Sequence, residues 1–179
     1  VIDVSKYQGK IDWKQVKQSG VQGAIIRVGY RGYAKAGTLV LDPYFDANMM
    51  GAAAAGIPVG VYFFSQAITE AEAKEEAQFT LNAIKKYKLG YPVYIDTEYS
   101  GAALKSGRAD KLSRANRTAV VKAFCEEVER HKYFTGIYAS TSWFKNQLDM
   151  SKLQAYSVWC AHYGVSKAGY PCAMWQYSS

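Results

Sequence analysis

The feature that most constrains the fold is an alternation of short apolar runs with helical patterns along most of the chain. The apolar runs are rich in β-branched and aromatic residues, which is typical of buried strands. Repeated strand–helix units predict a parallel sheet with helices packed on it. The expected strands span residues 1–4, 23–29, 57–64, 91–96 and 135–139, and the expected helices span residues 12–17, 42–55, 69–87, 113–131 and 143–147.

The C-terminal part of the chain does not follow this alternation of strands and helices. Residues 156–161 and 172–177 resemble strands but are separated by a segment without a helical pattern, so we predict a hairpin there. A complete (β/α)₈ barrel usually needs about 250 residues. We therefore predict one domain over residues 1–179: an α/β fold with an irregular, abbreviated TIM-like (β/α) barrel, in which five βα units are followed by bare strands. Seven strands are visible, and the final strand that would close the barrel is missing.

Two acidic residues end the central strand. Asp96 and Glu98 are separated by one residue, so their side chains are expected on the same face of the strand. Repulsion and burial raise the pKa of at least one such carboxyl group, which then can act as a general acid. Barrel enzymes keep their active sites at the C-terminal ends of strands, which favours a catalytic role for the two acids. Without the barrel context, the two acids would fit a strand that runs into a solvated acidic loop equally well. Asp3 is a further candidate, because an acid in an apolar strand is costly unless it is paired or functional.

The net charge of +7 favours an anionic partner, either nucleic acid or a polymer such as a bacterial cell wall. No helix-turn-helix, RNP-like aromatic motif or finger spacing is present, so nucleic acid is not expected. The 15 Tyr residues suit carbohydrate binding, because their rings are amphipathic.

The cysteines and histidines form no metal-ligand pattern. Cys125, Cys160 and Cys172 show no CxxC spacing, and His131 and His162 form no HExxH set, so neither a metal nor a cofactor is expected. Cys160 and Cys172 either pair across the predicted hairpin or remain thiols.

No apolar run is long enough for a transmembrane helix, so membrane insertion is not expected. The chain begins without Met inside a strand-like segment, and any signal segment is expected upstream of it.

Several motifs occur in one order along the chain. They are Asp3-Val4-Ser5-x-Tyr7-Gln8-Gly9-x-Ile11-Asp12-Trp13, Arg27-Val28-Gly29, the run from Ala55 to Phe64, Asp96-x-Glu98, Gly136-Ile137-Tyr138 and Met174-Trp175-Gln176-Tyr177. Together they resemble the glycoside hydrolase family 25 lysozymes, which are N-acetylmuramidases of bacteria and their phages. The resemblance implies an irregular α/β barrel that cleaves the β-1,4 bond between N-acetylmuramic acid and N-acetylglucosamine with retention.

The resemblance also implies roles for the acids. Glu98 matches the general acid/base. Asp96 matches a carboxylate that either attacks the sugar or orients its N-acetyl group, and both routes stay open. Asp3 matches an acid that supports the site. Family members usually carry a further Asp on a last strand, and this sequence ends before that strand.

Side chains at strand ends are expected to line the sugar groove, because apolar sugar faces stack on aromatic rings; ordinary core packing is the alternative for each ring. The candidates are Tyr62, Phe64, Tyr138, Trp159, Trp175, Gln176 and Tyr7, with Arg27 as a second-tier partner of the carboxylates.

Two other functions stay open. A chitinase-like hydrolase usually places more acids before the final Glu, where Tyr94 and Ile95 stand here. A non-catalytic cell-wall binding domain on a degenerate barrel fits the missing strand but not the intact acid pair. As a muramidase, the protein is expected to be a monomer that acts on peptidoglycan glycan strands, outside the cell or in the wall, after secretion or phage delivery.

Overall fold

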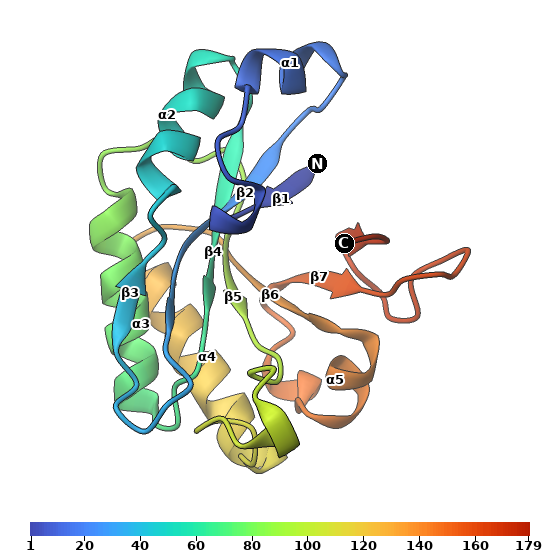
Figure 1. Ribbon diagram of the computed structural model, residues 1–179. Helices are drawn as coiled ribbons and strands as arrows, with labels where there is room; N and C mark the ends of the chain where they lie inside the picture. Colours follow the sequence, from blue (N-terminus) through green and yellow to red (C-terminus); the bar gives the residue numbers. More distant parts are fainter.

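The computed structural model describes all residues of the chain, 1–179. Its centre is a curled sheet with the strand order β1-β2-β4-β5-β6-β7-β8, in which every pair along the path is parallel (Figure 1). β3 pairs antiparallel with β2. The strands are β1 (Ile2–Val4), β2 (Ala24–Arg31), β3 (Leu39–Leu41), β4 (Val59–Phe64), β5 (Val93–Asp96), β6 (Thr135–Ser140), β7 (Ser157–Ala161) and β8 (Met174–Gln176).

Five α-helices connect these strands and confirm the five predicted βα units. They are α1 (Trp13–Gln18), α2 (Phe45–Ala54), α3 (Glu70–Ile84), α4 (Arg114–Arg130) and α5 (Thr141–Asn146), with short 3₁₀ helices η1 (Lys6–Gln8), η2 (Ala103–Lys105) and η3 (Met150–Lys152). Side chains cap most of them: Asp12, Thr69, Ser113 and Ser140 each accept a backbone N–H of the first turn. None of the helices has the length and apolar composition needed to cross a membrane.

The sheet forms a half-barrel, which confirms the predicted abbreviated barrel. The helices α3 and α4 pack side by side on one face of the sheet, and β1 and β8 at its two ends are not paired with each other (Figure 1). A side-chain hydrogen bond from Gln176 to Asp3 bridges the gap between them. The barrel is therefore open on the side where both ends of the chain lie.

The predicted hairpin at the C-terminus is wrong. β7 and β8 are parallel, with Trp159 opposite Met174 and Ala161 opposite Gln176. A parallel connection needs a crossover of about a dozen or more residues, and the irregular segment 162–173 has that length without a helix. Of the two alternatives for Cys160 and Cys172, the structure has the free thiols and no disulfide.

Two local predictions near residue 40 also need correction. The segment 30–40, between the strand expected at 23–29 and the helix expected at 42–55, contains the end of β2 and the start of β3, which form an antiparallel pair. The helix expected over residues 42–55 begins at Phe45, with Tyr44 as its N-cap, so Asp42 lies before it and does not cap it. The carboxylate of Asp42 is instead used for tertiary contacts with Arg27.

The apolar core has two parts. The larger cluster lies between the sheet and the helices and includes Phe63 and Phe124, both fully buried. A smaller cluster lies on the concave side of the sheet and is built around Ile25, Tyr94 and Trp159. Burial of these large rings stabilises the curl, because each removes about 150–250 Å² of surface from water.

Candidate active site

A pocket of about 150 Å³ opens at the C-terminal ends of the parallel strands. All of its lining residues were candidates from the sequence: Asp3, Tyr62, Asp96, Glu98, Tyr138, Trp159 and Gln176. The pocket therefore joins β1, β4, β5, β6, β7 and β8.

The parallel register explains why these side chains meet. Asp96 is the last residue of β5 and lies opposite Phe64 of β4 and Tyr138 of β6. Ends of neighbouring parallel strands lie at one edge of the sheet, so side chains placed there share one opening. Glu98 follows Asp96 by two residues and lines the same pocket, in agreement with the expected spacing.

Asp96 is the buried carboxyl group of the pocket. Its side chain is 5% exposed, and its Oδ1 atom has no hydrogen-bond donor. Burial raises the pKa of Asp96 well above its ordinary value, and the charges of Glu98 and Asp3 raise it further. The guanidinium group of Arg27 opposes both effects and lowers the pKa.

The other two acids also hold their protons more tightly than in water. Glu98 lies at the pocket mouth, where desolvation raises its pKa while a hydrogen bond with Asp96 opposes the shift. Burial raises the pKa of Asp3, and the hydrogen bond from Gln176 partly offsets it. Raised carboxyl pKa values gathered in one pocket are typical of acid–base chemistry near neutral pH.

The amide of Gln176 joins three parts of the site. Its Nε2 donates to Asp3 Oδ2 at 2.9 Å, and its Oε1 accepts from the hydroxyl of Tyr138 at 2.7 Å and from that of Tyr163. Trp159 packs edge-on against the ring of Tyr138, with a centroid distance of 4.5 Å. These contacts fix the aromatic wall of the pocket relative to the acids.

Three predicted substrate-binding residues lie outside the pocket. Trp175 lines an adjoining cavity of about 470 Å³ between β1 and β8, which shares Asp3, Trp159 and Gln176 with the pocket. The indole N–H of Trp175 donates to the carbonyl of His162 at 2.8 Å. Phe64 is partly buried at the end of β4 without lining the pocket. Tyr7 is 77% exposed in η1, directly after β1.

Sequence reasoning missed Asp42, which organises the loop after β1. Its Oδ2 atom pairs with Arg27 Nε at 2.7 Å and accepts the backbone N–H of Lys6 at 3.0 Å. Its Oδ1 atom accepts the backbone N–H of Tyr44 at 2.9 Å. No local signal pointed to this pairing, because the Asp-Pro dipeptide at 42–43 is also a common start of a helix.

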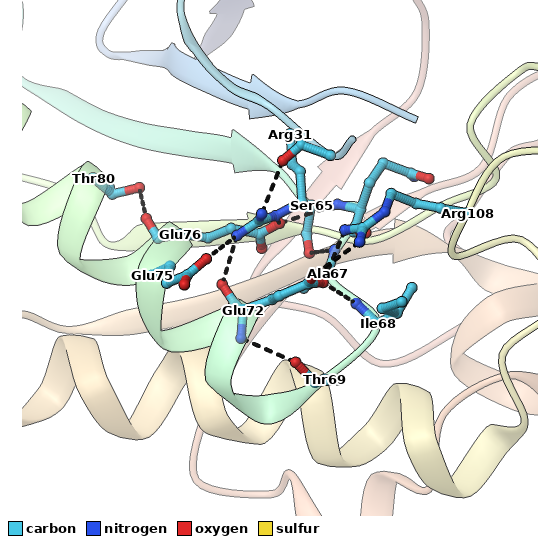
Figure 2. A network of polar contacts seen from close by, with 12 residues as sticks. Arg31, Ser65, Ala67, Ile68, Thr69, Glu72, Glu75, Glu76, Thr80 and Arg108 are labelled. Carbon is cyan, nitrogen blue, oxygen red and sulfur yellow. Dashed lines mark hydrogen bonds and ion pairs between the residues drawn. The ribbon is translucent and has the colours of Figure 1, made fainter. Parts of the chain in front are cut away.

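A network of charged side chains supports the loop that follows Glu98 (Figure 2). Arg108 of this loop forms two hydrogen bonds with Glu72, at 2.7 and 2.8 Å. Arg31 at the end of β2 pairs with Glu76 at 2.9 Å. The network thus joins the end of β2, the start of α3 and the loop after β5.

A parallel half-barrel with acids converging in an aromatic-walled pocket is typical of glycoside hydrolases, which flank the scissile bond with carboxyl groups. The family model described as "Glycosyl hydrolases family 25" matches residues 2–179. The chain belongs to this family.

Known proteins agree with this assignment. The chain is 30% identical to Lysozyme M1 of Streptomyces globisporus over 99% of its own length and 61% of that protein. It is 28% identical to the autolytic lysozyme of Clostridium acetobutylicum, over 93% and 45% of the two chains. The chain thus spans about half to three fifths of the length of these relatives.

Solved structures show the same fold. The modular autolysin LytC of Streptococcus pneumoniae, solved with a synthetic peptidoglycan ligand, has a TM-score of 0.85 and 27% identity, covering 99% of this chain and 42% of that one. The lysozyme of Streptomyces coelicolor has a TM-score of 0.78 and 25% identity, covering 99% and 82%.

Proposed function

We propose that this domain hydrolyses peptidoglycan at the β-1,4 bond between N-acetylmuramic acid and N-acetylglucosamine, with retention. The observation that carries the proposal is the convergence of Asp3, Asp96 and Glu98 in one aromatic-walled pocket. The lysozymes among its relatives and the peptidoglycan-bound autolysin with the same fold support this substrate.

In the proposed reaction, Glu98 donates its proton to the glycosidic oxygen as the bond to the muramic C1 breaks. Asp96 either attacks C1 or orients the substrate's N-acetyl group to attack it. Water then enters at C1 on the face that the leaving sugar has left, and Glu98 takes its proton. Two displacements at C1 give retention.

The position of each acid supports these roles. Glu98 lies at the exposed pocket mouth, where a leaving oxygen can reach it. Asp96 lies deeper, where burial raises its pKa and the charge of Arg27 opposes that rise. Asp3 is held by Gln176 and supports the site without a proton transfer of its own.

Peptidoglycan lies outside the cytoplasmic membrane, so we place the action of the domain at the cell wall or outside the cell. All three acids come from one chain, so a monomer suffices for this chemistry.

Digestion of purified peptidoglycan, with mass analysis of the reduced new ends, tests the reaction. Muramic acid at the new reducing ends is the expected result. Glucosamine ends would contradict the bond specificity, and binding without digestion would favour a wall-binding domain.

The variant Glu98→Gln tests the acid. We expect turnover to fall by at least about 100-fold, because the amide cannot protonate the leaving oxygen. Binding to wall fragments and thermal unfolding should stay close to those of the parent. Glu126→Gln, on the exposed face of α4, is the matched control and should keep full turnover. Substantial turnover in Glu98→Gln would contradict the assignment.

A further inference from the structure

A compact group of two aromatic rings and two cations lies beside the catalytic pocket. Lys6 Nζ is 5.4 Å from the ring centroid of Tyr7 and 5.7 Å from that of Tyr30. Arg27 Cζ is 5.0 Å and 5.7 Å from the same two centroids. Both rings thus lie within cation–π distance of both cations.

The group adjoins the pocket through Arg27 and β1. Burial raises the pKa of both Asp96 and Tyr62, which line the pocket, and the positive charge of Arg27 opposes that rise in each case. Lys6 and Tyr7 belong to η1, which follows the strand that carries Asp3. The group therefore lies on the β1–β2 side of the pocket.

The backbone that carries the exposed ring of Tyr7 is fixed by local contacts. Ser5 and Gln8 form a reciprocal capping box around η1, and the N–H of Lys6 is fixed by Asp42. Tyr7 is nevertheless 77% exposed. A ring on a backbone that is already fixed loses less conformational entropy when a ligand covers it than a ring on a free loop does.

The two cations differ in their freedom. Arg27 is buried and its Nε is committed to Asp42 at 2.7 Å. Lys6 is only partly buried and takes part in none of the ion pairs of the structure. The ammonium group of Lys6 is thus the cation that remains for a ligand.

The size of the catalytic pocket makes a second binding region necessary for a polymer. Its volume of about 150 Å³ is small beside the roughly 300–1,000 Å³ of common ligand pockets. A glycan chain must therefore extend beyond it, into the adjoining cavity of about 470 Å³ on the β8 side and onto the surface on the β1–β2 side.

We infer that Lys6, Tyr7 and Tyr30 form a second substrate subsite, which binds a sugar residue that carries a carboxylate. The rings stack on the apolar face of the sugar, and Lys6 pairs with the carboxylate. This inference rests on the proposed function. In peptidoglycan the carboxylate belongs either to a free lactyl group or to a stem peptide, and both present the same chemistry to Lys6.

The test compares two glycans with the whole chain: peptide-free glycan with free lactyl carboxylates, and the same glycan after those carboxyl groups are reduced to alcohols. The readout is the ratio of the two kcat/KM values. We expect the parent to prefer the acidic glycan by about fivefold, the gain of one favourable exposed ion pair. Lys6→Gln should lower the ratio to about one. Lys10→Gln removes a nearby exposed charge and should keep the parent's ratio.

A parent ratio of one, or an unchanged ratio in Lys6→Gln, would overturn the subsite. Tyr7→Ala should lower kcat/KM for both glycans. Tyr7→Phe should keep the parent's values, because the ring and not the hydroxyl stacks on the sugar. Peptide-bearing glycan distinguishes the two possible carboxylates. If Lys6→Gln lowers kcat/KM for that glycan, Lys6 pairs with the stem-peptide carboxylate; if kcat/KM is unchanged, Lys6 pairs with the lactyl carboxylate.

Binding of the same glycans by calorimetry separates this inference from the proposed reaction. A parent that binds the acidic glycan more tightly but cleaves nothing contradicts the reaction and keeps the subsite. A parent that binds both equally contradicts the subsite.

Discussion

Arg27 and Gln176 oppose the effect of burial on two of the three acids of the pocket. Burial raises the pKa of all three carboxyl groups, but Arg27 favours the negative form of Asp96 and Gln176 that of Asp3. For Glu98 burial is opposed only by the hydrogen bond with Asp96. The group best placed at the pocket mouth is therefore also the one without a cation or an amide to stabilise its charge.

A raised pKa also predicts how stability depends on pH. The folded state holds the Asp96 proton more tightly than the unfolded state, so this contribution to stability is present below the ordinary pKa near 4 and is lost as pH rises through the raised pKa. The side chain of the variant Asp96→Asn does not titrate, so this fall in stability with rising pH is absent. We expect the difference in unfolding free energy between pH 4 and pH 8 to shrink by about 1 kcal/mol or more. Urea unfolding at both pH values measures it, and an unchanged difference would contradict the raised pKa.

The acids were predictable from the sequence because their evidence is local. Asp96 and Glu98 end one strand at a spacing that fixes their common side, and the strand itself is an unambiguous apolar run. The pairing of Arg27 with Asp42 was not predictable, because it depends on how β2 and the segment after β3 meet in space.

At the scale of the elements, strands and helices with strong periodic patterns were predicted nearly to their ends. The direction of β8 was not, because the segment 162–173 carries no helical pattern and only its length permits a crossover. β3 was missed for a related reason: it is three residues long and is stabilised by pairing with β2 rather than by its own sequence.

The junction of β2 and α3 depends on a buried ion pair, which makes a prediction at this scale (Figure 2). Burial raises the pKa of Glu76 to about 7, and Arg31 opposes that shift. Arg31→Leu would leave Glu76 buried without its counter-charge, and we expect a loss of about 3–5 kcal/mol in unfolding free energy. Urea unfolding at pH 8 measures it. Lys122→Gln breaks an exposed pair on α4 and serves as control, with an expected change below about 0.5 kcal/mol. Equal losses of unfolding free energy in Arg31→Leu and Lys122→Gln would show that the buried pair stabilises the fold no more than the exposed pair does.

For the whole molecule, an open half-barrel has a weak edge where β1 and β8 face each other. β8 is three residues long and pairs with β7 alone. Side-chain hydrogen bonds are therefore needed to hold β8 against the other strands. Gln176 provides these hydrogen bonds, since its one amide contacts β1, β6 and the loop after β7. The architecture therefore couples the integrity of the catalytic pocket to the attachment of the last strand.

Gln176→Ala tests this coupling. The amide's three hydrogen bonds contribute about 1 kcal/mol each, so we expect the opening free energy of β8 amides to fall by about 3 kcal/mol in native-state hydrogen exchange. Amides of β4 and β5 should exchange as in the parent, because their pairing lies in the middle of the sheet. Ser178→Ala changes a neighbouring exposed residue and should leave β8 unaltered. Faster exchange throughout the sheet would mean that the edge and the centre open together, and unchanged exchange in β8 would mean that backbone pairing with β7 is sufficient to hold it.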